Sequence, residues 1–166
     1  MLSQEELLEL FDKDDYNIIV PNLYVSDYTF AINVNALLKN NIKCVISLMN
    51  DSMPKYITDS YRYNNIVHYH IIIADDPNSN ITQHFDTTFN IIDNFVTNKQ
   101  NILVHCMQGV SRSPTIIINY LAKKRMQGNY KNLFDKDIDS IIYYIRNIRS
   151  ININGGFYKQ LENIYK

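Results

Sequence analysis

The chain has 166 residues, 46% of them hydrophobic and 12% aromatic, a size and composition that predict one globular domain with a sizeable core. A net charge of −1 excludes the strongly basic surface of a nucleic-acid-binding protein, and no apolar run approaches the ~20 residues of a membrane span. The acidic first residues are unlike a secretory signal, and two cysteines do not make a disulfide framework. We therefore expect a cytoplasmic protein, with nuclear residence also open, that is not secreted and has no nucleic-acid or membrane partner.

The first half of the chain alternates helix and strand patterns. Residues 3–12 are predicted to form a helix within an N-terminal extension (1–15), with Ser3 as its N-cap and Glu6 at the capping-box position. This helix is expected to pack on its own domain, to form a dimer contact or to line the site. The strands expected next are residues 18–20, 23–25, 42–48 and 66–73, with a turn at Pro21-Asn22, Cys44 in the core, and helices at 29–39 and 54–60.

The second half follows the same alternation. A polar loop at 74–80 leads to a helix at 82–97, and the short apolar run 102–104 indicates a buried strand. The helices expected after it are residues 114–126, 135–149 and 157–165, with Gly128 ending the first and Gly155-Gly156 breaking the chain before the last. The predicted fold class is therefore α/β, with a central, mostly parallel sheet of about four to five strands flanked by helices.

The segment at residues 105–113, between a strand and a helix, reads His-Cys-Met-Gln-Gly-Val-Ser-Arg-Ser. A loop that enters a helix N-terminus can direct its backbone N–H groups at an anion, and the helix dipole favours negative charge there. Gly109 allows a tight turn, and the planar guanidinium of Arg112 suits two oxygens of a phosphate. Cys106 lies where this positive field would stabilise a thiolate, so the segment predicts a nucleophile directed at phosphorus.

The spacing of Cys106 and Arg112, with five residues between them, resembles the phosphate-binding loop of protein tyrosine phosphatases. The longer pattern His-Cys-x-x-Gly-x-Ser-Arg-Ser resembles their dual-specificity branch, and the chain is similar to its small, atypical members over about residues 18–165. The resemblance implies a protein-tyrosine-phosphatase-like fold and a single catalytic domain over residues 1–166. The closing pattern of the family is matched at Arg149, Ile151, Asn154, Gly156 and Phe157. It is not matched at Ser150 and Ile153, where the family usually has prolines.

The resemblance also implies a two-step hydrolysis that uses no metal and no cofactor. Cys106 would attack phosphorus and form a phosphocysteine, while Arg112 would hold the phosphate oxygens. Ser113 would donate a hydrogen bond to the departing thiolate, and His105 would orient the loop and help to keep the cysteine ionised. The residues expected to surround the phosphate are Met107, Gln108, Gly109, Val110, Ser111 and Arg112.

The general acid is expected to be Asp75 and not its neighbour Asp76. In the family the acid precedes, by six positions, an aliphatic residue that opens the next helix, and Asp75 has this spacing to Ile81. Asp76 precedes Pro77, which favours an extended backbone and a turn-forming role.

The expected substrate is a phosphoprotein that carries phosphotyrosine or phosphoserine/threonine. The first alternative is a phosphatase of phosphoinositides or RNA 5′ ends, which the uncharged Met107, Gln108 and Val110 disfavour, although Arg149 could supply one more cation. The second is a pseudophosphatase that binds phosphoproteins without turnover, which the intact cysteine, arginine and candidate acid disfavour. The protein is expected to be a monomer, or a homodimer formed through the N-terminal helix.

Overall fold

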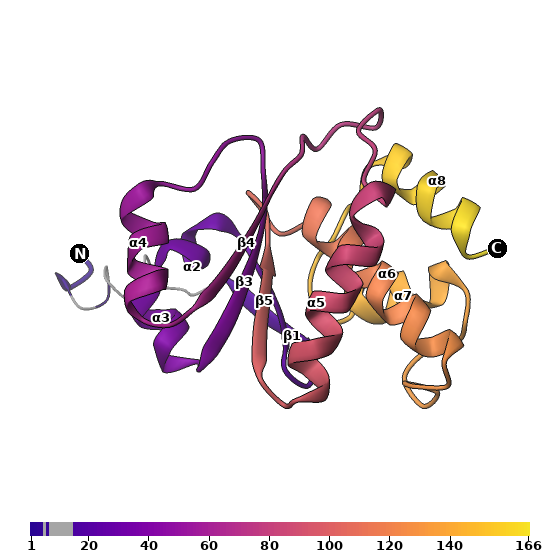
Figure 1. Cartoon of the computed structure of the whole chain (residues 1–166), viewed down its shortest axis with the longest axis horizontal. Helices are drawn as coiled ribbons and strands as arrows, with labels where there is room; N and C mark the ends of the chain where they lie inside the picture. The colour runs from indigo at the N-terminus through magenta and orange to yellow at the C-terminus, as the bar shows by residue number, and fades with distance from the viewer. Residues whose placement is uncertain (5, 7–14) are drawn as a thin grey trace.

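A five-stranded sheet lies at the centre of the molecule, with the strand order β1-β2-β5-β3-β4 (Figure 1). The structure, a computed structural model, describes residues 1–4, 6 and 15–166. β1 (Tyr16–Val20) runs antiparallel to β2 (Leu23–Ser26), whereas β2, β3 (Ile42–Met49), β4 (Val67–Ile72) and β5 (Asn101–His105) are mutually parallel. The prediction of a mostly parallel sheet of four to five strands flanked by helices is confirmed.

Helices cover both faces of this sheet (Figure 1). One face carries α2 (Tyr28–Ile32), α3 (Val34–Lys39) and α4 (Lys55–Tyr63); the other carries α5 (Phe85–Thr97), α6 (Arg112–Met126), α7 (Ile138–Arg146) and α8 (Gly155–Ile164). Successive side chains of β5 point to opposite faces, so Leu103 joins the core under α2–α4 while Ile102 and Val104 join the core under α5–α8. Within the described residues, no helix combines the length and the apolar character needed to cross a membrane.

Several predicted helices differ in their bounds from those observed. The helix expected at 29–39 is split at Asn33, whose backbone N–H closes α2 on the Phe30 carbonyl while its side chain caps α3. The helix expected at 82–97 begins as a 3₁₀ turn, η1 (Thr82–His84), and the one expected at 135–149 is shortened to Ile138–Arg146. Gly155 and Gly156 do not break the chain, because they form the first turn of α8 behind the N-cap Asn154.

The start of the chain is described only in part. The backbone N–H of Ser3 donates to Glu6 Oε2 at 2.7 Å, and the backbone N–H of Glu6 donates to Ser3 Oγ at 3.1 Å, which is the predicted capping box. The rest of the predicted N-terminal helix, residues 5 and 7–14, lies outside the described residues. Its expected part in a dimer contact or in a wall of the site therefore stays a prediction.

The carboxyl ends of the parallel strands meet at one edge of the sheet. Ser26 at the end of β2 and Ser47 in β3 both lie opposite His105 at the end of β5. The segments that leave these strands and the neighbouring β4 are therefore gathered at the same edge, where ligand sites of open α/β sheets form.

Candidate active site

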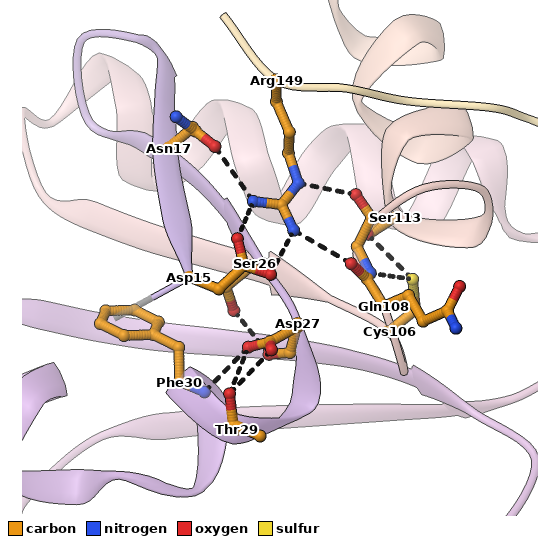
Figure 2. Close-up of polar contacts among 11 residues, drawn as sticks. Asp15, Asn17, Ser26, Asp27, Thr29, Phe30, Cys106, Gln108, Ser113 and Arg149 are labelled. Carbon is orange, nitrogen blue, oxygen red and sulfur yellow. Dashed lines mark hydrogen bonds and ion pairs between the residues drawn. The ribbon is translucent and has the colours of Figure 1, made fainter. Parts of the chain in front are cut away.

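The segment from Cys106 to Ser111 connects β5 to α6 and curls around the cysteine thiol. Cys106 is 2% exposed, and its Sγ accepts a hydrogen bond from the backbone N–H of Gly109 at 3.2 Å. The hydroxyl of Ser113, in the first turn of α6, lies 3.2 Å from the same sulfur (Figure 2). The Gly109 N–H and the Ser113 hydroxyl thus both lie within hydrogen-bonding distance of Sγ.

The carbonyl groups of this loop are all held away from the thiol. Because a peptide's C=O and N–H point in opposite directions, tying the carbonyls outward turns the N–H groups inward and makes an anion-binding concavity. The pairs are Cys106 O with His105 Nδ1 (3.1 Å), Met107 O with Tyr28 N (3.0 Å), Gln108 O with Arg149 Nη2 (3.0 Å), Gly109 O with Arg149 Nε (2.8 Å), Val110 O with Asn152 N (2.9 Å) and Ser111 O with Thr115 N (3.0 Å).

Gly109 is required at its place in the loop for two reasons. Its φ of +68° lies in the left-handed region that side chains disfavour. A Cβ there would also stand 2.6 Å from the carbonyl oxygen of Ser26 and 2.6 Å from Arg149 Nη2. The loop therefore lies directly against the end of β2 and against the arginine that holds it.

Arg149 is the main support of the loop, and it is nearly buried, with 7% of the residue exposed. All five of its N–H donors are used (Figure 2). Nε donates to the Gly109 carbonyl and Nη2 to the Gln108 carbonyl. Nη1 and Nη2 form a bidentate ion pair with Asp15 at 2.8 and 3.0 Å, and Nη1 also donates to Asn17 at 3.0 Å. The expectation that Arg149 could supply a cation to a highly charged substrate is therefore wrong, because its charge faces Asp15 and the back of the loop.

Arg112 begins α6 at the rim of the loop and is 6% exposed. One of its nitrogens, Nη1, donates to Asn50 Oδ1 at 2.5 Å and to the carbonyl of Ile73 at 2.9 Å. These two contacts fix the guanidinium plane. Arg112 also lines a cavity of about 240 Å³, together with Cys106, Asp75, Met107, Gln108, Val110 and Ser111.

Asp75, in the loop that follows β4, lines the same cavity as Arg112 and Cys106. Its Oδ1 accepts hydrogen bonds from Ser111 Oγ at 2.6 Å and from Asn154 Nδ2 at 2.8 Å, so Oδ2 is the oxygen available to a substrate. Asp76 instead shapes the turn, since its Oδ1 accepts from the Asn78 N–H at 2.7 Å. The structure thus brings Asp75 to Cys106 and assigns Asp76 to the loop backbone.

The Asp75 loop is fastened to the start of α8. A Cβ on Gly156 would stand 1.9 Å from the Pro77 carbonyl oxygen, so the loop backbone passes directly over this glycine. Gln160, one turn later, accepts from the Ile81 N–H at 3.1 Å and donates to the Ser79 carbonyl at 2.9 Å. The position of Asp75 is therefore set by α8 as well as by its own strand.

His105 is fully buried at the end of β5 and forms the first link of a polar chain. Burial lowers the pKa of His105 and of His68 to about 4, so both imidazoles are neutral at pH 7. With Nδ1 donating to the Cys106 carbonyl, His105 Nε2 accepts from Ser47 Oγ at 2.6 Å, and Ser47 Oγ in turn accepts from His68 Nε2 at 2.8 Å. His105 therefore orients the loop by hydrogen bonding and contributes no positive charge to the thiol.

Several residues of the site had no sequence signal of their own. Asn50 holds Arg112, Tyr28 holds a loop carbonyl through its backbone, and Asp15 neutralises Arg149. Asn154 could have been found, because it belongs to the closing pattern matched from Arg149 to Phe157, but its contact with Asp75 is tertiary. In the described part of the chain, no three His, Cys, Asp or Glu side chains are grouped to hold a metal ion.

A buried thiol and a fixed arginine flanking an N–H cradle, at the carboxyl end of a parallel sheet, define the class of cysteine-based phosphatase domains. The family model for the dual specificity phosphatase catalytic domain matches residues 23–166, and the chain therefore belongs to the dual specificity phosphatase family.

Individual relatives agree with this membership. A probable dual specificity protein phosphatase of Dictyostelium discoideum is 35% identical over 149 residues, covering 90% of this chain and 34% of that protein. Dual specificity protein phosphatase 22 of Xenopus tropicalis is 30% identical over 151 residues, which covers 90% of this chain and 65% of that protein. The crystal structure of DUSP15 superposes with a TM-score of 0.76 at 28% identity, covering 91% of this chain and 87% of that one. The chain thus spans about a third of the first relative and 65% of the second.

Proposed function

We propose that the chain is a dual-specificity protein phosphatase that hydrolyses phosphotyrosine and phosphoserine/threonine through a phosphocysteine intermediate. The observation that supports this most is the loop whose six carbonyls are tied outward around a buried thiol. Inward N–H groups and the fixed Arg112 guanidinium suit the equatorial oxygens of a phosphoryl group as charge shifts during transfer.

In the first step the Cys106 thiolate attacks phosphorus and the bond from phosphorus to the ester oxygen breaks. The leaving oxygen takes its proton from Asp75, whose Oδ1 accepts from Ser111 and Asn154, which leaves Oδ2 to carry the proton. The phosphoryl group remains bound to sulfur, with its oxygens on Arg112 and the loop N–H groups.

In the second step a water molecule attacks phosphorus and gives a proton to the Asp75 carboxylate. The sulfur–phosphorus bond breaks, inorganic phosphate forms and Cys106 leaves as a thiolate. The hydroxyl of Ser113 and the N–H of Gly109, each 3.2 Å from Sγ, stabilise this leaving group. His105 acts as a positioning residue through its bond to the Cys106 carbonyl.

A protein substrate is favoured over a polyanionic lipid or an RNA 5′ end. Among the residues that line the cavity at Cys106, Arg112 is the one cation, and the charge of Arg149 is taken by Asp15. A single phosphate therefore has a set of donors, whereas the described residues that line this cavity offer further phosphates no second cation.

Aryl phosphate hydrolysis tests the proposal. Cys106→Ser should abolish turnover and Arg112→Ala should lower it at least ~10²-fold, with the circular dichroism spectrum of the folded protein retained. Cys44→Ala is the matched control, since burial in β3 raises the pKa of that thiol to about 12 and leaves it unreactive. EDTA should have no effect. Turnover that survives Cys106→Ser would rule out the cysteine mechanism, and equal hydrolysis of phosphotyrosine and phosphothreonine peptides would support dual specificity.

A further inference from the structure

A second and larger cavity, of about 600 Å³, opens beside the candidate phosphate site. The two cavities share Met107 and Arg112, so a ligand can occupy both at once. The second cavity is formed where β2 and β3 end, by the start of α2 and the segment that leads into α4. Its apolar walls are Tyr28, Met49, Pro54 and Met107, and it contains one carboxylate, Asp51.

The charge of this second cavity is negative once phosphate is bound. Arg112 is then shared between its Asn50 and Ile73 contacts and the phosphate oxygens. Asp51 is exposed, and its carboxylate has no ion-pair partner in the described part of the chain. The nearby Lys55 is paired with Asp59 at 2.6 Å, and its side chain is 87% exposed. Asp51 thus remains available to a ligand.

His70 does not offset this charge. Burial lowers the pKa of His70 below the usual value, so its ring is neutral at pH 7. With Arg112 engaged by the bound phosphate, the cavity presents apolar walls and the unpaired Asp51 carboxylate, which together complement a side chain with an aliphatic stem and a cationic end.

We propose that this cavity binds an arginine or lysine side chain that flanks the phosphorylated residue of the substrate. The stem would pack on Tyr28, Pro54 and Met107, and the cation would pair with Asp51. The proposal rests on the proposed function, in that it names a preference of the same site for phosphoproteins with a basic residue beside the phosphate. A second phosphate is disfavoured in the cavity, because it would lie beside the Asp51 carboxylate.

Binding of phosphotyrosine peptides to a Cys106→Ser variant tests this independently of turnover. Each flanking position of a neutral peptide is replaced in turn by Arg, Gln or Glu, and affinity is measured by fluorescence anisotropy. At one flanking position we expect Arg to bind about tenfold more tightly than Glu, with Gln between them, which is the size of effect that one partly exposed attractive or repulsive pair gives.

The preference should fall to about twofold or less when Asp51→Asn is added, since the amide keeps the shape and removes the charge. Asp86→Asn, which removes the same charge from a side chain that is 96% exposed on α5, should leave the preference unchanged. A preference that survives Asp51→Asn, or peptides that all bind equally, would overturn the proposal.

Measuring aryl phosphate turnover by the unmodified chain distinguishes a failure of the basic-residue site from a failure of the proposed phosphatase function. Turnover by the unmodified chain, without a preference of the Cys106→Ser variant for Arg peptides, would overturn the basic-residue site and leave the phosphatase proposal standing. An Arg preference without turnover would support the site and contradict the catalytic proposal.

Discussion

Replacing Arg149 with lysine keeps a positive charge behind the phosphate loop but removes the planar fork that holds it. The guanidinium serves five acceptors: two loop carbonyls, both Asp15 oxygens and Asn17. One ammonium nitrogen has three donors and cannot reach acceptors on both sides, so at least two acceptors lose their partner. A buried acceptor left unpaired costs about 1–3 kcal/mol, so two such acceptors give a total loss of roughly 2–6 kcal/mol.

This loss should be visible in both stability and anion binding. For a domain of this size about 1 kcal/mol corresponds to 2–4 °C in Tm, so Arg149→Lys should lower Tm by roughly 4–24 °C. The freed Gln108 and Gly109 peptides should also weaken competitive inhibition by inorganic phosphate, measured well below the Tm of the variant.

The control is Arg146→Lys, the same substitution on the exposed face of α7, where one long contact of 3.4 Å to the Ile151 carbonyl is at stake. It should change the free energy of unfolding by no more than about 0.5 kcal/mol. If Arg149→Lys matched the wild type in Tm and in phosphate inhibition, the loop would not depend on the fork and our account of its conformation would be refuted.

Three further outcomes follow from the site. Asp75→Asn should lower kcat ~10²-fold or more on phosphoserine peptides, and should lower it less on aryl phosphates with good leaving groups. Asp76→Asn should lower kcat far less than Asp75→Asn does. The reverse order of the two variants in steady-state assays would contradict the assignment of the general acid. Gly156→Ala should lower Tm and kcat together because its Cβ would strike the acid loop, while Gly155→Ala, with open space around it, should be neutral or stabilising by about 0.5–1 kcal/mol. Because burial lowers the pKa of His105 to about 4, the unfolded chain binds a proton that the folded chain does not between pH ~6.5 and 4. Stability should therefore fall as pH falls through this window, by up to roughly 3 kcal/mol, and equal urea midpoints at pH 7 and pH 5 would contradict this.

Local patterns were sufficient for most elements of the fold and misleading for a few. The apolar run of β3 and the helix behind the cysteine loop were predicted because burial leaves a periodic trace in the sequence. Asn33 was missed as a helix boundary, since its capping role depends on backbone angles that the residue type does not reveal. Gly155-Gly156 was interpreted as a break because glycine weakens helices. The need for Gly156 comes from the Pro77 backbone above it, and no local pattern encodes that contact.

The candidate site divides in the same way. Residues 105–113 are contiguous, so their grouping in one loop between a strand and a helix could be predicted from their order. The direction of an arginine side chain depends instead on which acceptors lie within its reach. Arg149 was therefore considered as one more cation for a highly charged substrate, whereas Asp15 and two loop carbonyls hold its guanidinium behind the loop.

The conformation of the loop is imposed by donors from outside it. The six outward carbonyls are held by five residues from four parts of the fold. These are His105 in β5, Tyr28 at the start of α2, Thr115 in α6, and Arg149 and Asn152 after α7. A cysteine and an arginine at the right spacing supply the reacting groups, but they do not by themselves turn the N–H groups inward. A chain that kept Cys106 and Arg112 and lost Arg149 would keep the motif and lose two of the contacts that make it an anion site.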